Sequence, residues 1–259
     1  MTLIKSQHLI LFFVSLFILV KETAGKTNAT AECKALGDAV DWFLFYKLPK
    51  KTIAQIISAT SATWTADKAA LTSKENNSLV ETLAGWVEPM PESLSGFGYN
   101  NNPPSMTGVS TSSTSKGILM FTNSETVDEA FLLVYTMDGF LENGVGWVWP
   151  QVLTSQGHMG LCMQISESDI SSIATSLLYQ QPLIYFYFIN ETVQDQQQEL
   201  MQLLEGNQKV LTPMYWDLQS ITTHKTSVPQ KEMLGSSGAA ICLQQFQLSA
   251  IFSSLAGNE

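Results

Sequence analysis

The sequence predicts a mixed fold of β-strands and α-helices, of either the α/β or the α+β class. Short apolar runs rich in aromatic and β-branched residues recur along residues 41–189, and turn residues separate them. Two later segments instead carry apolar residues at the spacing of a helix face. Strands that alternate with helices favour a layered sheet covered by helices, and the sequence contains no repeat on the scale of a solenoid.

The first strand is expected at residues 41–48 (DWFLFYKL), a run of aromatic and apolar residues that ends at a proline. Residues 53–65 are small and without a clear period, and residues 79–87 fit either a short helix or a short strand. Residues 96–104 (GFGYNNNPP) predict a cluster of turns. Residues 105–115 predict a Ser/Thr-rich loop that is short for a domain boundary.

The middle of the chain predicts a hairpin of two buried strands, Lys116–Thr122 (KGILMFT) and Ala130–Tyr135 (AFLLVY), which a polar turn separates. Residues 144–150 (GVGWVWP) predict an aromatic loop. Residues 160–165 (GLCMQI) predict another short strand.

Two helices and one strand are expected after residue 165. A Ser-x-x-Asp capping signature at Ser166 and Asp169 precedes apolar residues at helical spacing, so residues 166–180 predict a helix. Residues 183–189 (LIYFYFI) predict a strand. Residues 191–204 predict a Gln-rich amphipathic helix.

The first 25 residues predict a secretory signal peptide. Lys5 supplies positive charge, residues 8–20 form an apolar run of signal-peptide length, and Ala24 and Gly25 are small enough for cleavage. A membrane anchor is the alternative, although the run is short for a bilayer. We therefore expect a secreted mature protein with no membrane association once the signal is removed.

An exported chain gives meaning to three Asn-x-Ser/Thr sequons, at Asn28, Asn76 and Asn190. Each is a candidate glycosylation site on an exposed loop, with an unused sequon as the alternative.

The mature cysteines are Cys33, Cys162 and Cys242, and three cysteines cannot all pair within one chain in an oxidising compartment. A metal site is the competing interpretation. No CxxC spacing occurs, and His158 and His224 are scattered, so we expect no metal ion and no cofactor.

The charge of the chain is strongly acidic, with a formal net charge of −10, and every basic residue is Lys. DNA binding neutralises phosphates, and bidentate phosphate recognition depends on Arg. We expect the chain to repel DNA at neutral pH and to repel it less in acid, where carboxylates take up protons. Acidity that serves solubility alone is the alternative that charge by itself favours.

Four strings together resemble the deoxyribonuclease II family of acid endonucleases. Residues 40–49 (VDWFLFYKLP) are similar to the family's VDWF-x-x-YKLP opening, and residues 99–104 (YNNNPP) to its Tyr-Asn turn and proline pair. Residues 114–119 (TSKGIL) resemble its H-T-K-G-V-L string. Trp149 and Pro150, followed by residues 160–163 (GLCM), resemble its later landmarks. The likeness is good from about Cys33 to Ile189 and fades after Trp216.

The resemblance implies a phospholipase-D-like layered sheet flanked by helices. It implies a complete first half at residues 26–190 and an incomplete second half at residues 191–259. It also implies a Cys33–Cys162 disulfide, and closing so long a loop is worth roughly 3–5 kcal/mol in the chain-entropy model. Cys242 is then left over, either as a buried thiol or with a partner outside this chain.

The family's mechanism uses two His-x-Lys motifs that meet in one cleft and cut DNA to 3′-phosphates without a metal. One His attacks phosphorus, the other protonates the leaving 5′ oxygen, and the lysines neutralise the phosphoryl oxygens. Here Thr114 stands where the first His is expected, and Lys116 keeps the lysine position. The expected place of the second motif lies beyond the end of this chain. His224 has its lysine at the next residue, and His158 is interpreted as a turn or surface residue.

A threonine hydroxyl is a poor nucleophile without an adjacent base. The favoured hypothesis is therefore a secreted, glycosylated deoxyribonuclease-II-like protein that is catalytically inactive. It would act as a binding or interaction protein, with DNA as a weak partner and Lys116 as either a phosphate contact or a plain surface lysine. The resemblance adds a lysosome as an alternative location. The competing hypotheses are an active acid endonuclease that uses His158, His224 or a dimer, and a truncated product without independent function.

Overall fold

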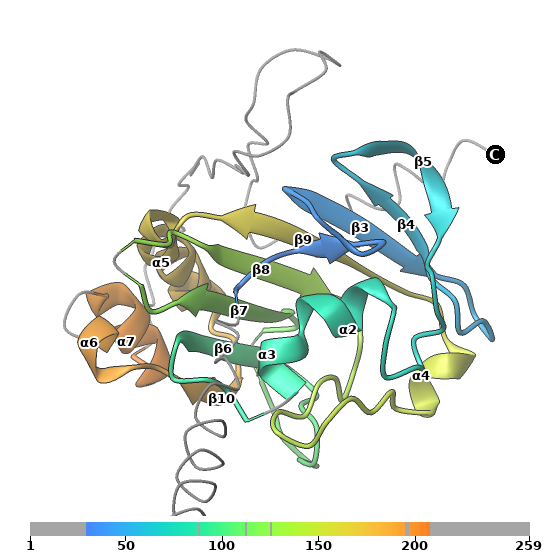
Figure 1. Ribbon diagram of the computed structural model, residues 1–259. Coiled ribbons are helices and arrows are strands. Elements are labelled where there is room, and N and C mark those ends of the chain that lie inside the picture. Colours follow the sequence, from blue (N-terminus) through green and yellow to red (C-terminus); the bar gives the residue numbers. More distant parts are fainter. Residues whose placement is uncertain (1–29, 88, 112, 125, 195–196, 208–259) are drawn as a thin grey trace, which may run out of the picture.

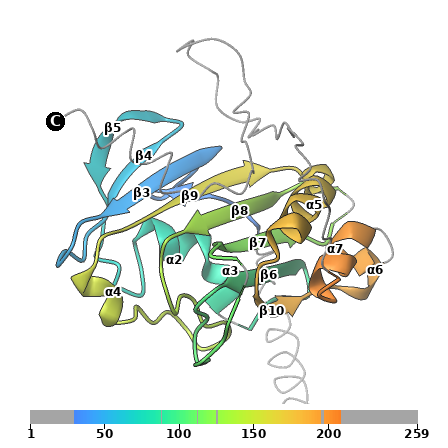
Figure 2. The same cartoon turned by 180° about the vertical axis from the view of Figure 1, so that it is seen from behind.

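An antiparallel eight-stranded sheet organises the part of the chain described by the computed structural model, which is residues 30–207 except 88, 112, 125 and 195–196 (Figures 1 and 2). Its strand order is β10-β6-β7-β8-β9-β3-β4-β5. The strands are β3 (Trp42–Lys47), β4 (Gln55–Ser58), β5 (Ser61–Ala66), β6 (Leu94–Asn100), β7 (Lys116–Thr122), β8 (Ala130–Tyr135), β9 (His158–Ile165) and β10 (Ile184–Phe188). Every neighbouring pair is antiparallel, so the predicted mixed architecture is confirmed in its α+β form.

Helices cover both faces of this sheet (Figures 1 and 2). One face carries α2 (Ser78–Thr82) and α3 (Ala84–Val87), and the other carries α5 (Ile170–Gln180), α6 (Glu191–Gln194) and α7 (Gln198–Leu204). The remaining short elements are β1 (Lys34–Ala35), β2 (Asp38–Ala39), α4 (Val152–Ser155) and the 3-10 helix η1 (Glu167–Asp169). In this part of the chain, no helix has both the length and the apolar character needed to cross a membrane.

Strand β7 divides its side chains between two cores, because successive residues of a strand point to opposite faces. Ile118 and Met120 pack with the helix pair α2–α3 in the first core, whereas Leu119 and Phe121 pack with α5 and α7 in the second. All of β7 after Lys116 is buried, which explains why its sequence is a continuous apolar run.

A disulfide between Cys33 and Cys162 joins the segment before β1 to the middle of β9 and confirms the predicted pairing. A buried glutamine supports the junction. The side chain of Gln164 accepts a hydrogen bond from the backbone N–H of Cys33 at 2.9 Å and donates one to the carbonyl of Ala31 at 2.9 Å.

The predicted strands at 41–48, 116–122, 130–135, 160–165 and 183–189 are confirmed as β3, β7, β8, β9 and β10. The predicted helix at 166–180 is confirmed as η1 followed by α5, with the capping box at Ser166 and Asp169 in place. The open alternative at 79–87 is resolved as the helices α2 and α3.

The prediction of turns throughout residues 96–104 is wrong, because residues up to Asn100 belong to the fully buried strand β6. Its glycines are there for close packing. A Cβ at Gly96 would lie 2.6 Å from the carbonyl oxygen of Leu119, and one at Gly98 would lie 2.8 Å from the Tyr185 ring. Glycine in a strand interior often marks such an approach of neighbouring atoms.

Two further segments differ from the sequence-based expectation. Residues 53–65, which carry no clear period, contain the β4–β5 hairpin at the end of the sheet. The single helix expected at 191–204 is two helices, α6 and α7, and α7 packs on α5 through the buried residues Leu200 and Leu203.

Candidate functional site

Lys116 is the first residue of β7, at the centre of the sheet between β6 and β8. Thr114 precedes it by two residues and is exposed. Gly117 follows, where a Cβ would lie 2.6 Å from Cζ of Tyr99 and 2.8 Å from the carbonyl oxygen of Leu133. The Lys-Gly pair of the TSKGIL string therefore has a structural cause: the glycine lets the Tyr99 ring pack over the strand start.

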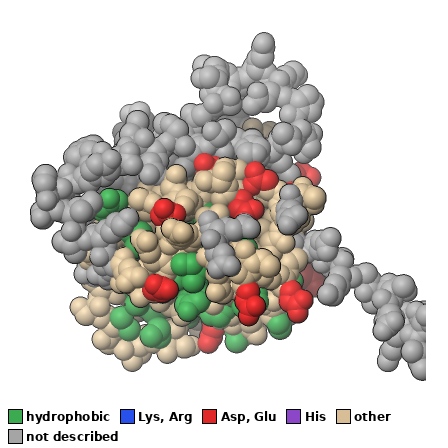
Figure 3. Space-filling view, turned by 90° about the vertical axis from the view of Figure 1, so that its left-hand side faces the viewer, with side chains coloured by type: hydrophobic (Ala, Val, Ile, Leu, Met, Phe, Trp, Pro, Cys, Tyr) green, Lys and Arg blue, Asp and Glu red, His purple; other side chains and the backbone are tan. Residues whose placement is uncertain are grey.

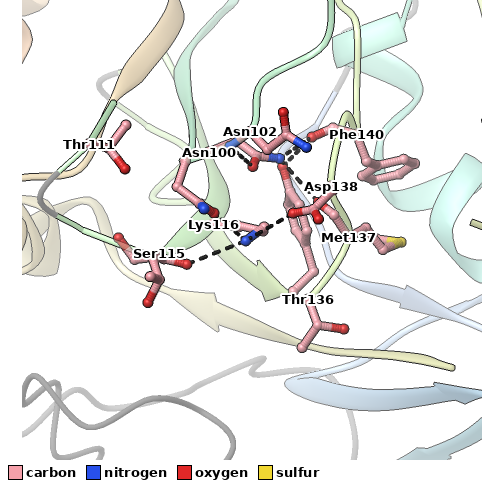
Figure 4. Close-up of polar contacts among 12 residues, drawn as sticks. Asn100, Asn102, Thr111, Ser115, Lys116, Thr136, Met137, Asp138 and Phe140 are labelled. Atoms are coloured by element: carbon pink, nitrogen blue, oxygen red, sulfur yellow. Dashed lines mark hydrogen bonds and ion pairs between the residues drawn. The ribbon is translucent and has the colours of Figure 1, made fainter. Parts of the chain in front are cut away.

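The Lys116 ammonium has three acceptors around it (Figure 4). Nζ lies 3.1 Å from Oδ1 of Asp138, contacts Oδ1 of Asn101, and lies 3.4 Å from the carbonyl oxygen of Thr114. Its side chain is 11% exposed, against 52% for Asp138. An ammonium group has three N–H donors, so these three acceptors can occupy all of them.

The buried side chain of Asn100 holds the turn at residues 137–140 that presents this carboxylate (Figure 4). Its Nδ2 donates to the carbonyls of Met137 at 3.1 Å and Phe140 at 3.0 Å. Its Oδ1 accepts from the backbone N–H of Asn102 at 2.9 Å. The end of β6 and this turn are thus joined by hydrogen bonds between neutral groups.

Two further contacts fix the same turn. Gly139 has a φ of 65° and donates its N–H to the carbonyl of Asn102 at 2.7 Å. The Tyr135 hydroxyl donates to the carbonyl of Phe140 at 2.7 Å, and burial raises the pKa of Tyr135 well above its ordinary value. Tyr135 therefore remains a neutral hydrogen-bond donor, which suits a structural role.

The loop that carries Thr114 is organised by its own side chains. Thr111 Oγ1 donates to the carbonyl of Ser113 at 2.7 Å, and the hydroxyls of Ser113 and Ser115 share a hydrogen bond of 2.7 Å. Within residues 30–207, the Thr114 hydroxyl has no hydrogen bond to a basic side chain. Among the described residues, no side chain is hydrogen-bonded to this hydroxyl as a base, and a threonine hydroxyl is a weak nucleophile without one.

His158 is the first residue of β9, opposite Lys47 of β3, and is only 4% exposed. Burial, and then the nearby Lys47 charge, lowers the pKa of His158, while Asp138 acts in the opposite direction. Neither ring nitrogen has a hydrogen bond of ordinary geometry, although the carbonyls of Thr136 and Leu153 lie close enough to favour the protonated ring. The interpretation of His158 as a turn or surface residue is therefore wrong, and its burial leaves it closed to a substrate.

Lys47, the lysine of the VDWFLFYKLP string, is fully buried. Its Nζ donates to four carbonyl oxygens, those of Leu48 at 3.1 Å, Lys51 at 3.1 Å, Thr154 at 3.1 Å and Gln156 at 2.6 Å. Burial lowers the pKa of Lys47, and the four acceptors oppose that shift by favouring the charged amine. This lysine ties α4 to the turn after β3 and does not face a substrate.

The sequons differ in their surroundings. Asn76 is exposed, with a φ of 62°, in the loop before α2. Asn190 is half-buried, and its side-chain oxygen accepts hydrogen bonds from the N–H and the hydroxyl of Thr192 at 3.0 and 2.9 Å. Three other predicted positions lie outside the described residues, namely Asn28, His224 and Cys242.

The end of the molecule that carries α6 and α7 presents acidic and apolar side chains, and no lysine is visible among its coloured atoms (Figure 3). Across residues 30–207, no three His, Cys, Asp or Glu side chains come together in a way that could hold a metal ion. A phosphate ligand would therefore find positive charge near Lys116 and not on this acidic face.

Sequence reasoning identified Thr114 and Lys116 through the TSKGIL string but missed Asp138. The aspartate follows the strand Ala130–Tyr135 in a turn that carries no recognisable motif. Asn100 and Asn101 belong to the YNNNPP string, which predicted only turns. In the structure, Asn100 hydrogen-bonds to the turn at residues 137–140, and Asn101 accepts a hydrogen bond from Lys116.

The family model described as Deoxyribonuclease II matches residues 32–234. Cell death-related nuclease 6 of Caenorhabditis elegans is 25% identical over 200 residues, which cover 72% of this chain and 51% of that protein. Deoxyribonuclease-2-alpha of Rattus norvegicus is 24% identical over 204 residues, covering 73% and 56%.

Deoxyribonuclease-2-beta of Mus musculus is 27% identical over 168 residues, which cover 60% of this chain and 46% of that protein. The chain thus spans about half the length of the curated relatives it matches.

Proposed function

The chain belongs to the deoxyribonuclease II family, and from that premise we propose that it is a deoxyribonuclease-II-like protein that does not cleave DNA by the family's histidine mechanism. The observation that carries this proposal is Thr114, an exposed hydroxyl without a base at the expected histidine position. Loss of the nucleophile in a well-studied hydrolase lowers turnover by roughly a millionfold.

The surroundings of Thr114 support the same conclusion. Lys116 has its three N–H donors occupied by Asp138, Asn101 and the Thr114 carbonyl. His158 is the one histidine among the described residues, and it is 4% exposed and lies opposite Lys47. In the alternative, an active acid endonuclease, His158 or His224 would have to reach the cleft, or a dimer would have to complete it. His158 would then have to lose the burial that lowers its pKa.

A nicking assay tests the proposal. The whole secreted protein is incubated with supercoiled plasmid at acid pH in EDTA, beside the rat Deoxyribonuclease-2-alpha as a positive control. We expect no cleavage above background by this protein or by its Thr114→His variant, since the rest of the site is unchanged. Plasmid nicking that either His158→Gln or His224→Gln abolishes would establish the active-nuclease alternative instead.

We also propose export and glycosylation, with residues 1–25 as the signal peptide, residues 26–190 as the family's first half and residues 191–259 as the beginning of the second. The signal-like leader, the Cys33–Cys162 disulfide and the exposed Asn76 sequon support export. A binding role, with nucleic acid bound weakly or with a protein partner, fits a family fold without its nucleophile. Recovery of the protein from medium, with a mass loss on enzymatic deglycosylation, is the expected observation.

A further inference from the structure

The carboxylate of Asp138 lies 3.1 Å from the ammonium of Lys116, at the start of β7 (Figure 4). We propose that Asp138 is a specificity-determining residue that closes Lys116 to phosphate, and that removing its charge opens a phosphate-binding site at the start of β7. This inference rests on the proposed function in one respect, that Lys116 is the anion-contacting group of the first motif.

Three acceptors from the described residues surround the Lys116 ammonium. Besides Asp138, its acceptors are the side-chain oxygen of Asn101 and the carbonyl oxygen of Thr114, and both are neutral. A phosphate can bind the ammonium only by displacing one of these three acceptors. The carboxylate, on a half-exposed side chain, is the one that a competing anion must displace, and it bears the same charge sign as that anion.

The carboxylate is placed by the fold rather than by chance contact of two long side chains. The buried Asn100 bonds to both ends of the turn at residues 137–140, and Gly139 closes it onto Asn102. An exposed ion pair is usually weak because ordering two side chains costs entropy. Here the aspartate is short and its backbone is anchored, so this cost is small.

The other charged groups near the turn do not replace Lys116 as an anion receptor. His158 interacts electrostatically with Asp138 but is buried. Glu142 accepts a hydrogen bond from the Ser105 hydroxyl at 3.1 Å and adds further negative charge. Lys116 is thus the group among these that could offer positive charge to an anion, and Asp138 neutralises it.

The test measures binding of a fluorescent 12-nucleotide single-stranded oligothymidylate by anisotropy, at neutral pH and several salt concentrations. Four whole-chain proteins are compared: wild type, Asp138→Asn, the double variant Asp138→Asn with Lys116→Met, and Asp38→Asn. Asp38 is an exposed acid in β2, so its variant makes the same change of net charge away from the site.

We expect Asp138→Asn to bind about tenfold more tightly than wild type, the value of one charge-assisted hydrogen bond. The slope of log affinity against log salt should steepen by about 0.7, which corresponds to one more neutralised phosphate on a single strand. The double variant should lose the gain, and Asp38→Asn should show much less of it.

An Asp138→Asn or Asp138→Ser protein that melts like wild type but shows no gain in affinity would overturn the inference. Equal gains from Asp138→Asn and Asp38→Asn would also overturn it, since net charge alone would then explain them. Failure of the proposed function is a separate result, because DNA cleavage is read in the nicking assay whereas this test reads only binding.

Discussion

The buried ammonium of Lys47 provides a test of how much its hydrogen bonds contribute to the stability of the fold. Lys47→Met keeps most of the side-chain volume but removes the donor to four carbonyls. Two of those carbonyls keep a second donor, since Leu48 and Thr154 accept backbone N–H groups at 3.2 and 2.9 Å. The carbonyls of Lys51 and Gln156 lose their ammonium donor.

The expected loss of stability follows from this count. Each buried acceptor left without a partner costs about 1–3 kcal/mol, and methionine avoids the several kcal/mol of desolvation that the ammonium incurs. The two acceptors together cost about 2–6 kcal/mol, and the avoided desolvation offsets only part of this because four hydrogen bonds already compensate it in the wild type. We expect a net loss of about 3 kcal/mol. For a domain of this size, each kcal/mol lowers the midpoint of thermal unfolding by about 2–4 °C, so the shift should be roughly 6–12 °C.

The measurement is urea and thermal unfolding of the whole protein, with Lys51→Met as the matched control. Lys51 is exposed and contributes only its backbone carbonyl to the cluster, so its variant should unfold like wild type. A Lys47→Met protein within about 1 kcal/mol of wild type would refute the reasoning, because the four carbonyls would then be satisfied without the lysine.

The remaining predictions concern the disulfide and the buried histidine. Replacing Cys33 and Cys162 with alanine opens a loop with a sequence separation of 129, which in the chain-entropy model costs about 5 kcal/mol, measurable by urea unfolding against wild type. Burial lowers the pKa of His158, so the unfolded chain takes up the proton first as the pH falls. The stabilisation from the neutral ring is complete above about pH 6.5 and is lost as the pH falls toward the lowered folded value, by at most about 1.4 kcal/mol per pH unit. His158→Gln should remove this dependence of the unfolding free energy on pH between pH 7.5 and 5. Burial raises the pKa of Asp67, so its contribution to the pH dependence has the opposite sign, but that contribution is the same in wild type and variant. An unchanged slope would show that His158 is not desolvated.

Elements buried on both faces were predictable because nothing in their sequence interrupts the apolar run. Strands β7 and β8 are of this kind, and α5 carries its capping box in the sequence itself. Strand β6 was not predictable, because its buried glycines resemble turn residues until the Leu119 backbone and the Tyr185 ring are known to press against them. Distant neighbours decide such cases, and local propensity cannot represent them.

The candidate site likewise contains residues that the sequence could predict and residues that it could not. The TSKGIL string located Thr114 and Lys116, because the likeness is carried by neighbouring residues of one strand. The contact with Asp138 depends on the register of β7 and β8 and on Asn100 holding the turn that follows β8. A contact between a strand start and a turn on another strand leaves no periodic or motif signal in either segment.

The two lysines in the family-like strings have different roles, one in the fold and one at the candidate site. Lys47 is enclosed by carbonyls and serves the fold, whereas Lys116 lies at the position of the family's first-motif lysine with its charge balanced by Asp138. A phosphodiester approaching β7 would meet a hydroxyl that no base activates, and an ammonium that a carboxylate already holds. Installing an imidazole at position 114 supplies a nucleophile but leaves that ammonium occupied, so electrostatic stabilisation of the phosphoryl oxygens would still be missing. Recovery of the family's chemistry therefore requires changes to at least two groups here, and the order in which binding and cleavage return would reveal which of them limits the site.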